Sequence, residues 1–322
     1  MKAVYTICTP SHIAEAKTLI TSALNHNTDI TAFIFIFNAD NYAKEELNKF
    51  NISNTVIIEE LGLENYGAMQ SRYNAFELSC ALKPYLADYL LHKKGFEQVV
   101  YFDADIYVTA ALSNVWQDLQ TKDIILTAHI NGTVIWENDE IAQKARRGIQ
   151  RNMLRGGAFN GGFFALNRTA GTQKFLAWWK NVLVDGAYNK PSKGLFTDQL
   201  WLMLVPVLFN DLLLASKHPG YNMAYWNLDE RKLRQADGNY QVSAADGTTG
   251  PLIFFHFSGY KLENKSMISV YHPNLYTFQS RPELTTLFNA YQTQLAAHGY
   301  EALKARYAPP KKGWKKLFGW RK

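Results

Sequence analysis

The stretch Val99-Val-Tyr-Phe-Asp103-Ala-Asp105-Ile-Tyr-Val108 decides the fold class of this chain. Residues 99–102 are an apolar run without polar alternation, which predicts a strand buried on both faces of a parallel sheet. Because alternate side chains of an extended strand point the same way, we expect Asp103 and Asp105 to converge beyond its carboxyl end. Sheets of this kind bind their ligands at that edge.

The two acids predict a metal site. Neighbouring carboxylates repel each other unless a cation joins them, and their oxygen ligands suit Mn²⁺ or Mg²⁺. A bare Asp-x-Asp triplet is also typical of a solvated turn with an aspartate cap. The apolar residues on both sides of the triplet favour the metal site over that turn.

The remainder of the 322 residues predicts an α/β fold. Strands are expected at residues 3–8, 31–37, 54–58, 123–129, 163–166 and 252–256. Helices are expected at 11–25, 42–50, 71–94, 139–154, 171–183 and 282–297, with a kink or break in the third at Lys83-Pro84. This order predicts a mostly parallel sheet with helices on both faces, in one catalytic body of residues 1–308.

A second polar cluster follows the apolar residues 252–255, in Phe254-Phe-His256-Phe-Ser-Gly259-Tyr-Lys261. The imidazole of His256 suits a third position on Mn²⁺. Gly259 would let the backbone approach a phosphate, and Lys261 would neutralise its charge. The alternative is a core histidine beside a glycine turn.

Two further segments carry polar groups. In Gly156-Gly-Ala-Phe-Asn160-Gly-Gly162, close glycines let backbone approach a ligand, and Asn160 offers a donor and an acceptor to hydroxyl groups. The alternative is a glycine turn between a helix and a strand. Asp198 and Gln199 precede an apolar segment, where an N-terminal cap on a helix is the alternative to a binding role.

In this order, the segments Tyr101-Phe-Asp-Ala-Asp105, Phe159-Asn-Gly-Gly162, Asp198-Gln199 and His256-Phe-Ser-Gly259 resemble GT-A-fold nucleotide-sugar glycosyltransferases. The nearest group is glycosyltransferase family eight with its bacterial polysaccharide and lipopolysaccharide relatives. The resemblance implies a Rossmann-like GT-A domain that binds Mn²⁺ or Mg²⁺ through Asp103, Asp105 and His256. It implies donor-binding positions at Lys83, Asp103, Ala104, Asp105, Gly259 and Lys261. It implies catalytic positions beside the transferred sugar at Asn160, Asp198 and Gln199.

The chain departs from the family pattern at three places. Thr9-Pro-Ser-His12 lacks the acids and the tyrosine of the family's donor signature, and Leu-Glu-Asn follows Lys261 where Pro-Trp is usual. Leu200 stands where a further aspartate is usual. These departures leave the sugar and the stereochemistry open. UDP is the default nucleotide and retention the expected outcome, while an inverting enzyme would use Asp198 as its base.

The excess of positive over negative charge lies at the end of the chain. The net charge is +6, and residues 311–322 hold six basic residues and no acid. The 34 basic residues less these six equal the 28 acidic ones, so the neutral body argues against a broad basic face for nucleic acid. Trp314, Leu317 and Phe318 share one helical face, which predicts that residues 309–322 bind an anionic membrane. The alternative is a disordered soluble tail.

These features predict a metal-dependent glycosyltransferase that moves a hexose from a nucleotide-sugar to a bacterial surface glycan, such as lipopolysaccharide, capsule or a lipid-linked oligosaccharide. We expect it in the cytoplasm, peripherally bound to the inner face of the membrane. A sugar nucleotidyltransferase is an alternative, but it would need a glycine-rich phosphate loop where Thr9-Pro-Ser-His12 stands. A non-catalytic glycan-binding module anchored by the tail is another.

Overall fold

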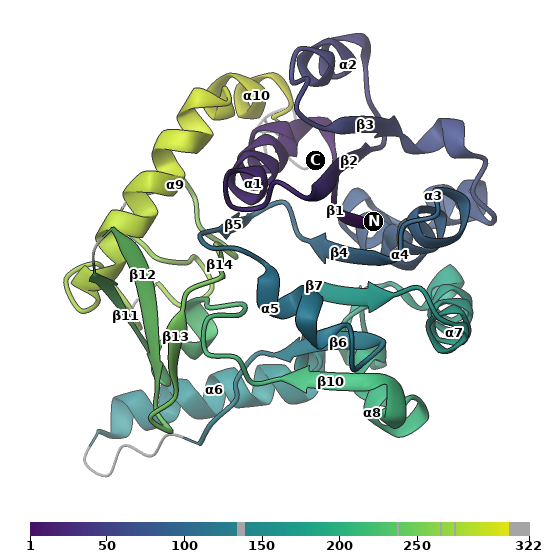
Figure 1. The fold of residues 1–322 in the computed structure, drawn as a ribbon. Coiled ribbons are helices and arrows are strands. Elements are labelled where there is room, and N and C mark those ends of the chain that lie inside the picture. The colour runs from purple at the N-terminus through teal and green to yellow at the C-terminus, as the bar shows by residue number, and fades with distance from the viewer. Residues whose placement is uncertain (134–138, 237, 265, 274, 309–322) are drawn as a thin grey trace, which may run out of the picture.

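The computed structural model describes residues 1–133, 139–236, 238–264, 266–273 and 275–308. A seven-stranded sheet with the order β10-β6-β7-β4-β1-β2-β3 forms its centre (Figure 1). Its strands are β1 (Lys2–Cys8), β2 (Ile30–Ile36), β3 (Asn54–Ile57), β4 (Gln98–Phe102), β6 (Ile124–Ala128), β7 (Phe159–Asn167) and β10 (Leu213–Ser216). All neighbours are parallel except β7, which is antiparallel to β4 and β6. The predicted mostly parallel sheet is confirmed.

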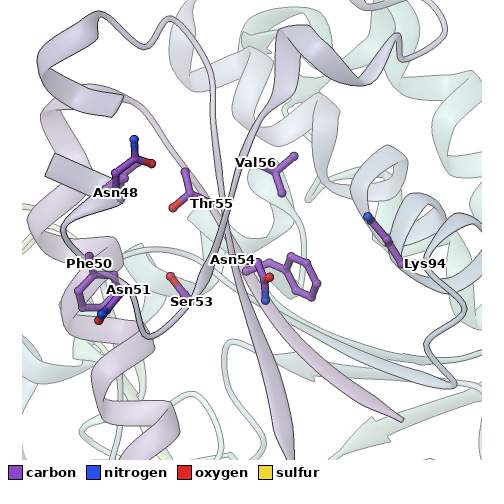
Figure 2. A pocket seen from close by; sticks show the side chains of 10 residues that line it. Asn48, Phe50, Asn51, Ser53, Asn54, Thr55, Val56 and Lys94 are labelled. Atoms are coloured by element: carbon purple, nitrogen blue, oxygen red, sulfur yellow. The ribbon is translucent and has the colours of Figure 1, made fainter. Parts of the chain in front are cut away.

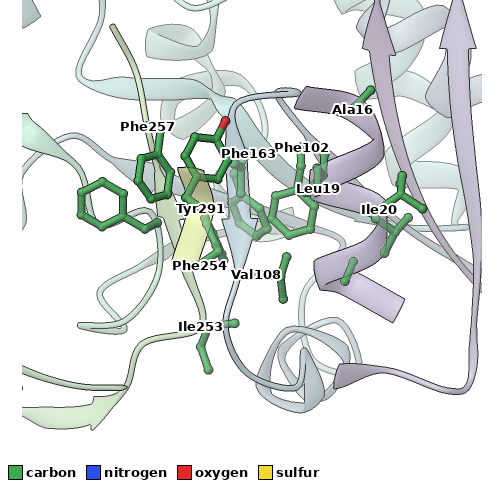
Figure 3. Packing of buried hydrophobic residues seen from close by; sticks show 14 of the residues in the cluster. Ala16, Leu19, Ile20, Phe102, Val108, Phe163, Ile253, Phe254, Phe257 and Tyr291 are labelled. Carbon is green, nitrogen blue, oxygen red and sulfur yellow. The ribbon is translucent and has the colours of Figure 1, made fainter. Parts of the chain in front are cut away.

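Helices cover both faces of this sheet because successive strand residues point to opposite sides. In β1, Val4 packs into a cluster with α1 (Ile13–His26), α9 (Thr285–Ala297) and α10 (Tyr300–Arg306), whereas Tyr5 packs into a cluster with α4 (Ala75–Asp88) and α7 (Ala170–Gly186). Figure 3 shows the first cluster, in which Phe102 and Phe163 of the sheet meet Leu19 of α1. The remaining helices are α2 (Asn41–Asn48), α3 (Tyr66–Arg72), α5 (Ser113–Asp118), α6 (Glu140–Gly156) and α8 (Val205–Leu208).

The helical region predicted at 71–94 is divided, but not at its proline. Asn74 and Glu77 form a capping box that begins α4, after Tyr73 has ended α3 in an extended conformation. Pro84 lies inside α4, which continues through Asp88 into a π-helical turn at Tyr89–Lys93. The predicted break at Lys83-Pro84 is therefore wrong, because a local cap sets the boundary instead.

A second, two-stranded sheet positions the end of β4. β5 (Ile106–Val108) follows β4 along the chain and pairs antiparallel with β14 (Phe254–His256), with His256 opposite Ile106. The predicted strand at 252–256 therefore joins this small sheet rather than the central one. A three-stranded sheet contains β11 (Arg231–Ala236), β12 (Asn239–Ala244) and β13 (Thr249–Pro251), and β8 (Asn189–Lys190) pairs with β9 (Leu195–Phe196).

The predicted body of residues 1–308 and tail of residues 309–322 stay predictions, since the tail lies outside the described residues. Among the helices of the described chain, none combines the length and apolar character needed to cross a bilayer.

Candidate functional site

Two aspartates and a histidine converge at the carboxyl end of β4. One ligand atom each of Asp103, Asp105 and His256 lies within 4.8 Å of the others. Residues 103–105 form a turn, closed by the Ile106 N–H donating to the Asp103 carbonyl at 3.1 Å. The expectation that strand alternation aligns the two carboxylates is therefore wrong, although they do converge. The Phe257 N–H donates to the Asp105 carbonyl at 2.9 Å. This hydrogen bond fixes the position of the segment after β14 relative to the turn.

His256 and Asp105 form a charge-coupled pair. His256 Nε2 lies 3.1 Å from Asp105 Oδ1, and the imidazole is 4% exposed. Desolvation opposes its charged form, but the carboxylate outweighs this effect and raises the pKa of His256. The imidazolium in turn lowers the pKa of Asp105 against the effect of desolvation. The second ring nitrogen, Nδ1, donates to Asn222 Oδ1 at 3.3 Å, which directs Nε2 toward the carboxylates.

Lys83 of α4 is the buried cation of the site. Its Nζ lies 3.2 Å from Asp103 Oδ1 and 3.1 Å from Asp198 Oδ2, and it donates to the Gly161 carbonyl at 2.9 Å. Desolvation alone would lower the pKa of Lys83, but the two carboxylates outweigh it and raise that pKa. Lys83 therefore stays charged and links two acids that lie 95 positions apart in the sequence.

Asp198 is 1% exposed. Burial raises its pKa, and Lys83 and a hydrogen bond with the Cys80 side chain offset this only in part. Asp198 lies in a turn before the 3₁₀ helix Trp201–Leu204, which has no side-chain cap. Helix capping therefore does not explain this residue. Cys80 is buried and belongs to the surroundings of the site.

Amide side chains join His256 of the acidic cluster to Gln199. Asn160 Nδ2 donates to Gln199 Oε1 at 3.3 Å, and Gln199 Nε2 donates to the Gly156 carbonyl at 2.8 Å. Asn222 Nδ2 donates to Asn160 Oδ1 at 3.0 Å, while its own Oδ1 accepts from His256. A continuous hydrogen-bonded path therefore runs from His256 through Asn222 and Asn160 to Gln199.

Two glycines keep the space between these groups open. A Cβ at Gly162 would lie 2.5 Å from His256 Cε1 and 2.9 Å from Asp103 Oδ2. A Cβ at Gly161 would lie 2.5 Å from Asp198 Oδ2. Both glycines lie inside β7, so a simple glycine turn does not describe them. The neighbouring carboxylates and imidazole leave room for hydrogen alone.

The other expected donor-site residues lie around this cluster. Ala104 is the middle residue of the turn between the two aspartates. Gly259 has a φ of +72°, and a Cβ there would lie 2.6 Å from the Tyr271 ring, so local packing already requires glycine. Lys261 is exposed. Burial lowers the pKa of His12, and the charges of Asp105 and Lys261 also act on that pKa. Lys261 therefore lies near the edge of the site.

Two surface hollows lie elsewhere. One of about 430 Å³ adjoins the edge strand β3 and is lined by Asn48, Ser53, Asn54 and Lys94 among others (Figure 2). Another, of about 460 Å³, adjoins α5. None of the expected site residues lines either hollow. We therefore assign the candidate site to the side-chain cluster at the end of β4.

The chain was compared with known proteins. No protein-family profile matches it. YfnF of Bacillus subtilis (strain 168), described as uncharacterized, is 24% identical over 291 residues, which cover 90% of each chain. YfnD of the same organism, also described as uncharacterized, is 22% identical over 262 residues, covering 80% of this chain and 77% of YfnD.

Solved structures identify the fold. The galactosyltransferase LgtC, crystallised with donor and acceptor sugar analogues, superimposes with a TM-score of 0.52 at 12% identity, over 92% of this chain and 96% of LgtC. The bifunctional glycosyltransferase WbbM also has a TM-score of 0.52 at 12% identity, over 94% of this chain and 51% of WbbM. The fold is GT-A. The GT-A sheet expected from the sequence is thus confirmed, and the roles of its site residues stay predictions.

The GT-A structure adds three residues that the sequence did not assign. Tyr101 OH donates to Asp103 Oδ1 at 2.6 Å. Its position two residues before Asp103 was a signal, because alternate strand residues share a face. Asn222 stands in a loop segment rich in amide and aromatic side chains, and His129 directly follows β6, but no spacing linked either residue to the aspartates. Asn222 reaches the site from a loop with a left-handed φ of 52°, and the partners of both residues lie far away in the sequence.

Gly162→Ala is predicted to weaken Mn²⁺ binding by at least about tenfold, since its Cβ would occupy the space between His256 and Asp103. Calorimetric titration with Mn²⁺ measures this affinity. Gly148→Ala in α6 is the matched control, because a Cβ there meets nothing within 4 Å. It should leave Mn²⁺ binding unchanged and raise the free energy of unfolding by roughly 0.5–1 kcal/mol. Unchanged binding in Gly162→Ala would contradict the assigned geometry.

His129 is predicted to make the protein less stable in mild acid. Its Nδ1 donates to the Ala158 carbonyl at 2.9 Å, and burial lowers the pKa of His129 to about 4. The unfolded chain takes up this proton near pH 6.5. The free energy of unfolding should therefore fall by up to about 3 kcal/mol as the pH drops from 6.5 to 4. Urea denaturation across this range tests it, and a profile identical to that of His129→Gln would refute it.

Proposed function

We propose that this chain is a metal-dependent glycosyltransferase. It moves a hexose from a nucleotide-diphosphate sugar, with UDP as the default nucleotide, to a bacterial surface-glycan acceptor such as lipopolysaccharide or capsule. The observation that carries the proposal is the cluster of Asp103, Asp105 and His256 at the carboxyl end of β4, with Asn160 and Gln199 connected to it. The GT-A fold shared with LgtC supports it.

The donor set fits a divalent cation. Two carboxylates and one imidazole suit Mn²⁺, or Mg²⁺ with additional water. The absence of a Cβ at Gly162 keeps the space between the ligands free, and Asn222 fixes the orientation of the His256 ring. Asp103, Asp105 and His256 would hold the cation, which would supply Lewis-acid stabilisation of the departing nucleoside diphosphate.

Lys83 would lie near the donor, and Asp198 would bind the transferred sugar. Lys83 contributes a buried charge that offsets the carboxylates of Asp103 and Asp198, so less negative charge opposes an anionic donor. Lys83 Nζ also lies 3.1 Å from Asp198 Oδ2. Retention is the expected stereochemical outcome, and an inverting enzyme with Asp198 as its base is the alternative. Asn160 and Gln199 offer amide groups to the sugar hydroxyls.

The tail, residues 309–322, would hold the enzyme on the inner face of the cytoplasmic membrane. Its six cations and its Trp314, Leu317 and Phe318 support this role. Vesicle flotation of the chain with and without residues 309–322 tests it, using vesicles that contain phosphatidylglycerol. Equal flotation of the two chains would contradict the proposed role of the tail in membrane binding.

A panel of nucleotide-sugars tests the catalytic proposal. We expect a UDP-hexose to release UDP with Mn²⁺ and not with a chelator. Pyrophosphate formation from a nucleoside triphosphate and a sugar phosphate would instead show a nucleotidyltransferase. The first connection after β1 gives no support to that reading, since the 3₁₀ turn Pro10–His12 contains no glycine. Glycan binding without release of nucleotide from any donor would show a non-catalytic module.

A further inference from the structure

Exposed large apolar side chains concentrate at one edge of the molecule. Eleven such side chains are exposed among the described residues. Six of them lie on α6, the 3₁₀ helix Trp201–Leu204 and α8, and these are Ile141, Leu154, Met203, Leu204, Val207 and Leu208. Ile141 is 82% exposed, Leu154 79% and Val207 77%. Clusters of this kind mark interaction surfaces.

The same face of α6 is strongly basic. Lys144, Arg147, Arg151 and Arg155 are exposed and follow Ile141 at intervals of three or four residues, which places them on one side of the helix. After Glu140 at its start, α6 contains no acid. The opposite side carries buried residues, among them Ile149 and Met153. Within the described ranges, none of these four cations pairs with an acid.

The C-terminal end of α6 adjoins the segment at 201–208. The Ala158 N–H, two residues beyond α6, contacts Met203 Sδ at 2.9 Å, and Gln199 Nε2 donates to the carbonyl of Gly156, the last residue of α6. Figure 1 shows α6 and α8 along the same lower edge of the molecule. We name this surface the basic apolar edge, formed by Ile141, Lys144, Arg147, Arg151, Leu154, Arg155, Met203, Leu204, Val207 and Leu208.

We propose that the basic apolar edge seats the folded body on an anionic phospholipid bilayer. Aliphatic side chains would enter the boundary between headgroups and acyl chains, and the flanking cations would neutralise the headgroups. This goes beyond the proposed anchoring by the tail, because it fixes how the catalytic body faces the membrane.

The positive charge of the basic apolar edge distinguishes between the partners that could cover it. The tail is itself basic, with six cations and no acid in residues 311–322, so it would be repelled from this edge. The same edge of a second copy carries the same charge. A nucleic acid would satisfy the cations but would leave six exposed aliphatic side chains without a partner. An anionic bilayer matches both features at once.

The edge adjoins the candidate site. Gln199 lies two residues before the 3₁₀ helix Trp201–Leu204, and α6 ends four residues before Asn160. Seating the edge on the bilayer would therefore hold the expected sugar-binding residues beside the membrane, where a lipid-linked acceptor has its glycan.

Vesicle sedimentation of the full chain tests the proposal. Vesicles contain equal parts of phosphatidylglycerol and phosphatidylcholine, or phosphatidylcholine alone. Each cation near an anionic surface raises the partition coefficient about fivefold, so Arg147→Gln with Arg151→Gln should lower it roughly 25-fold. Ile141→Ser with Leu154→Ser should lower it on the order of tenfold even at high salt, because apolar insertion is not screened.

The control is Lys93→Gln with Lys94→Gln, which removes the same charge from two exposed lysines beyond α4. It should change the coefficient by less than about twofold. All variants should keep the thermal unfolding midpoint and donor hydrolysis of the native chain, which separates this proposal from the proposed function. Unchanged vesicle binding of both α6 variants, or an equal loss in the control, would overturn the proposal. Preferential binding of the native chain to duplex DNA would also overturn the proposal. So would light scattering that shows a dimer for the native chain and a monomer for the α6 variants.

Discussion

Asp105→Asn should abolish measurable Mn²⁺-dependent release of nucleoside diphosphate, with a loss on the order of a thousandfold or more. Asparagine keeps the size of the side chain but removes the charge that faces His256 at 3.1 Å. A divalent cation would then lose one of three protein ligands, and the departing diphosphate would lose its charge stabilisation.

Two measurements separate this expectation from unfolding. Calorimetric titration should show Mn²⁺ affinity lowered by about 10–100-fold, while thermal unfolding without metal should show a folded protein. Asp185→Asn, which neutralises an exposed acid on α7, is the matched control and should keep full activity. Full activity in Asp105→Asn would contradict the assignment of Asp105 to a metal site.

Lys83→Met should lower the free energy of unfolding by about 3–5 kcal/mol. The substitution leaves Asp198, which is 1% exposed, without its cation. It also removes the positive charge shared by Asp103 and Asp198, so these two carboxylates repel each other. Charged groups that lose a buried partner retain their full desolvation cost. The pKa of Asp198, already raised by burial, should rise further. Urea denaturation measures the change in stability.

A second substitution distinguishes charge from packing. Lys83→Met combined with Asp198→Leu removes both members of the pair, and we expect it to recover part of the lost stability while remaining inactive. Lys180→Met is the control, because its ion pair with Asp88 is partly exposed and should contribute less than about 1 kcal/mol. If Lys83→Met costs no more than Lys180→Met, the buried ion pair does not stabilise the fold.

The predictions from sequence succeeded where the signal is local. The apolar runs at β1, β2 and β4 are unambiguous because both faces of these strands are buried. The boundary inside the region at 71–94 was misplaced, because a proline is conspicuous in a sequence while a capping box at Asn74 is subtle. The three-stranded sheet β11-β12-β13 was not expected at all. Its short polar strands, such as Asn239–Ala244, carry only a weak period-two pattern.

The sequence by itself determined the fold class, the chemistry of the site residues and the location of the net positive charge in the last twelve positions. These properties depend on residue type and on spacing over a few positions. Only the tertiary structure decided how the site is assembled. Lys83 meets Asp198 because both side chains reach Gly161 of β7 from different segments, and Asn222 meets Asn160 across 62 positions. Such contacts depend on how distant segments pack, which no local pattern encodes. The basic apolar edge also depends on tertiary packing. The sequence shows its cations, but only the burial of the side chains shows which side of α6 remains exposed.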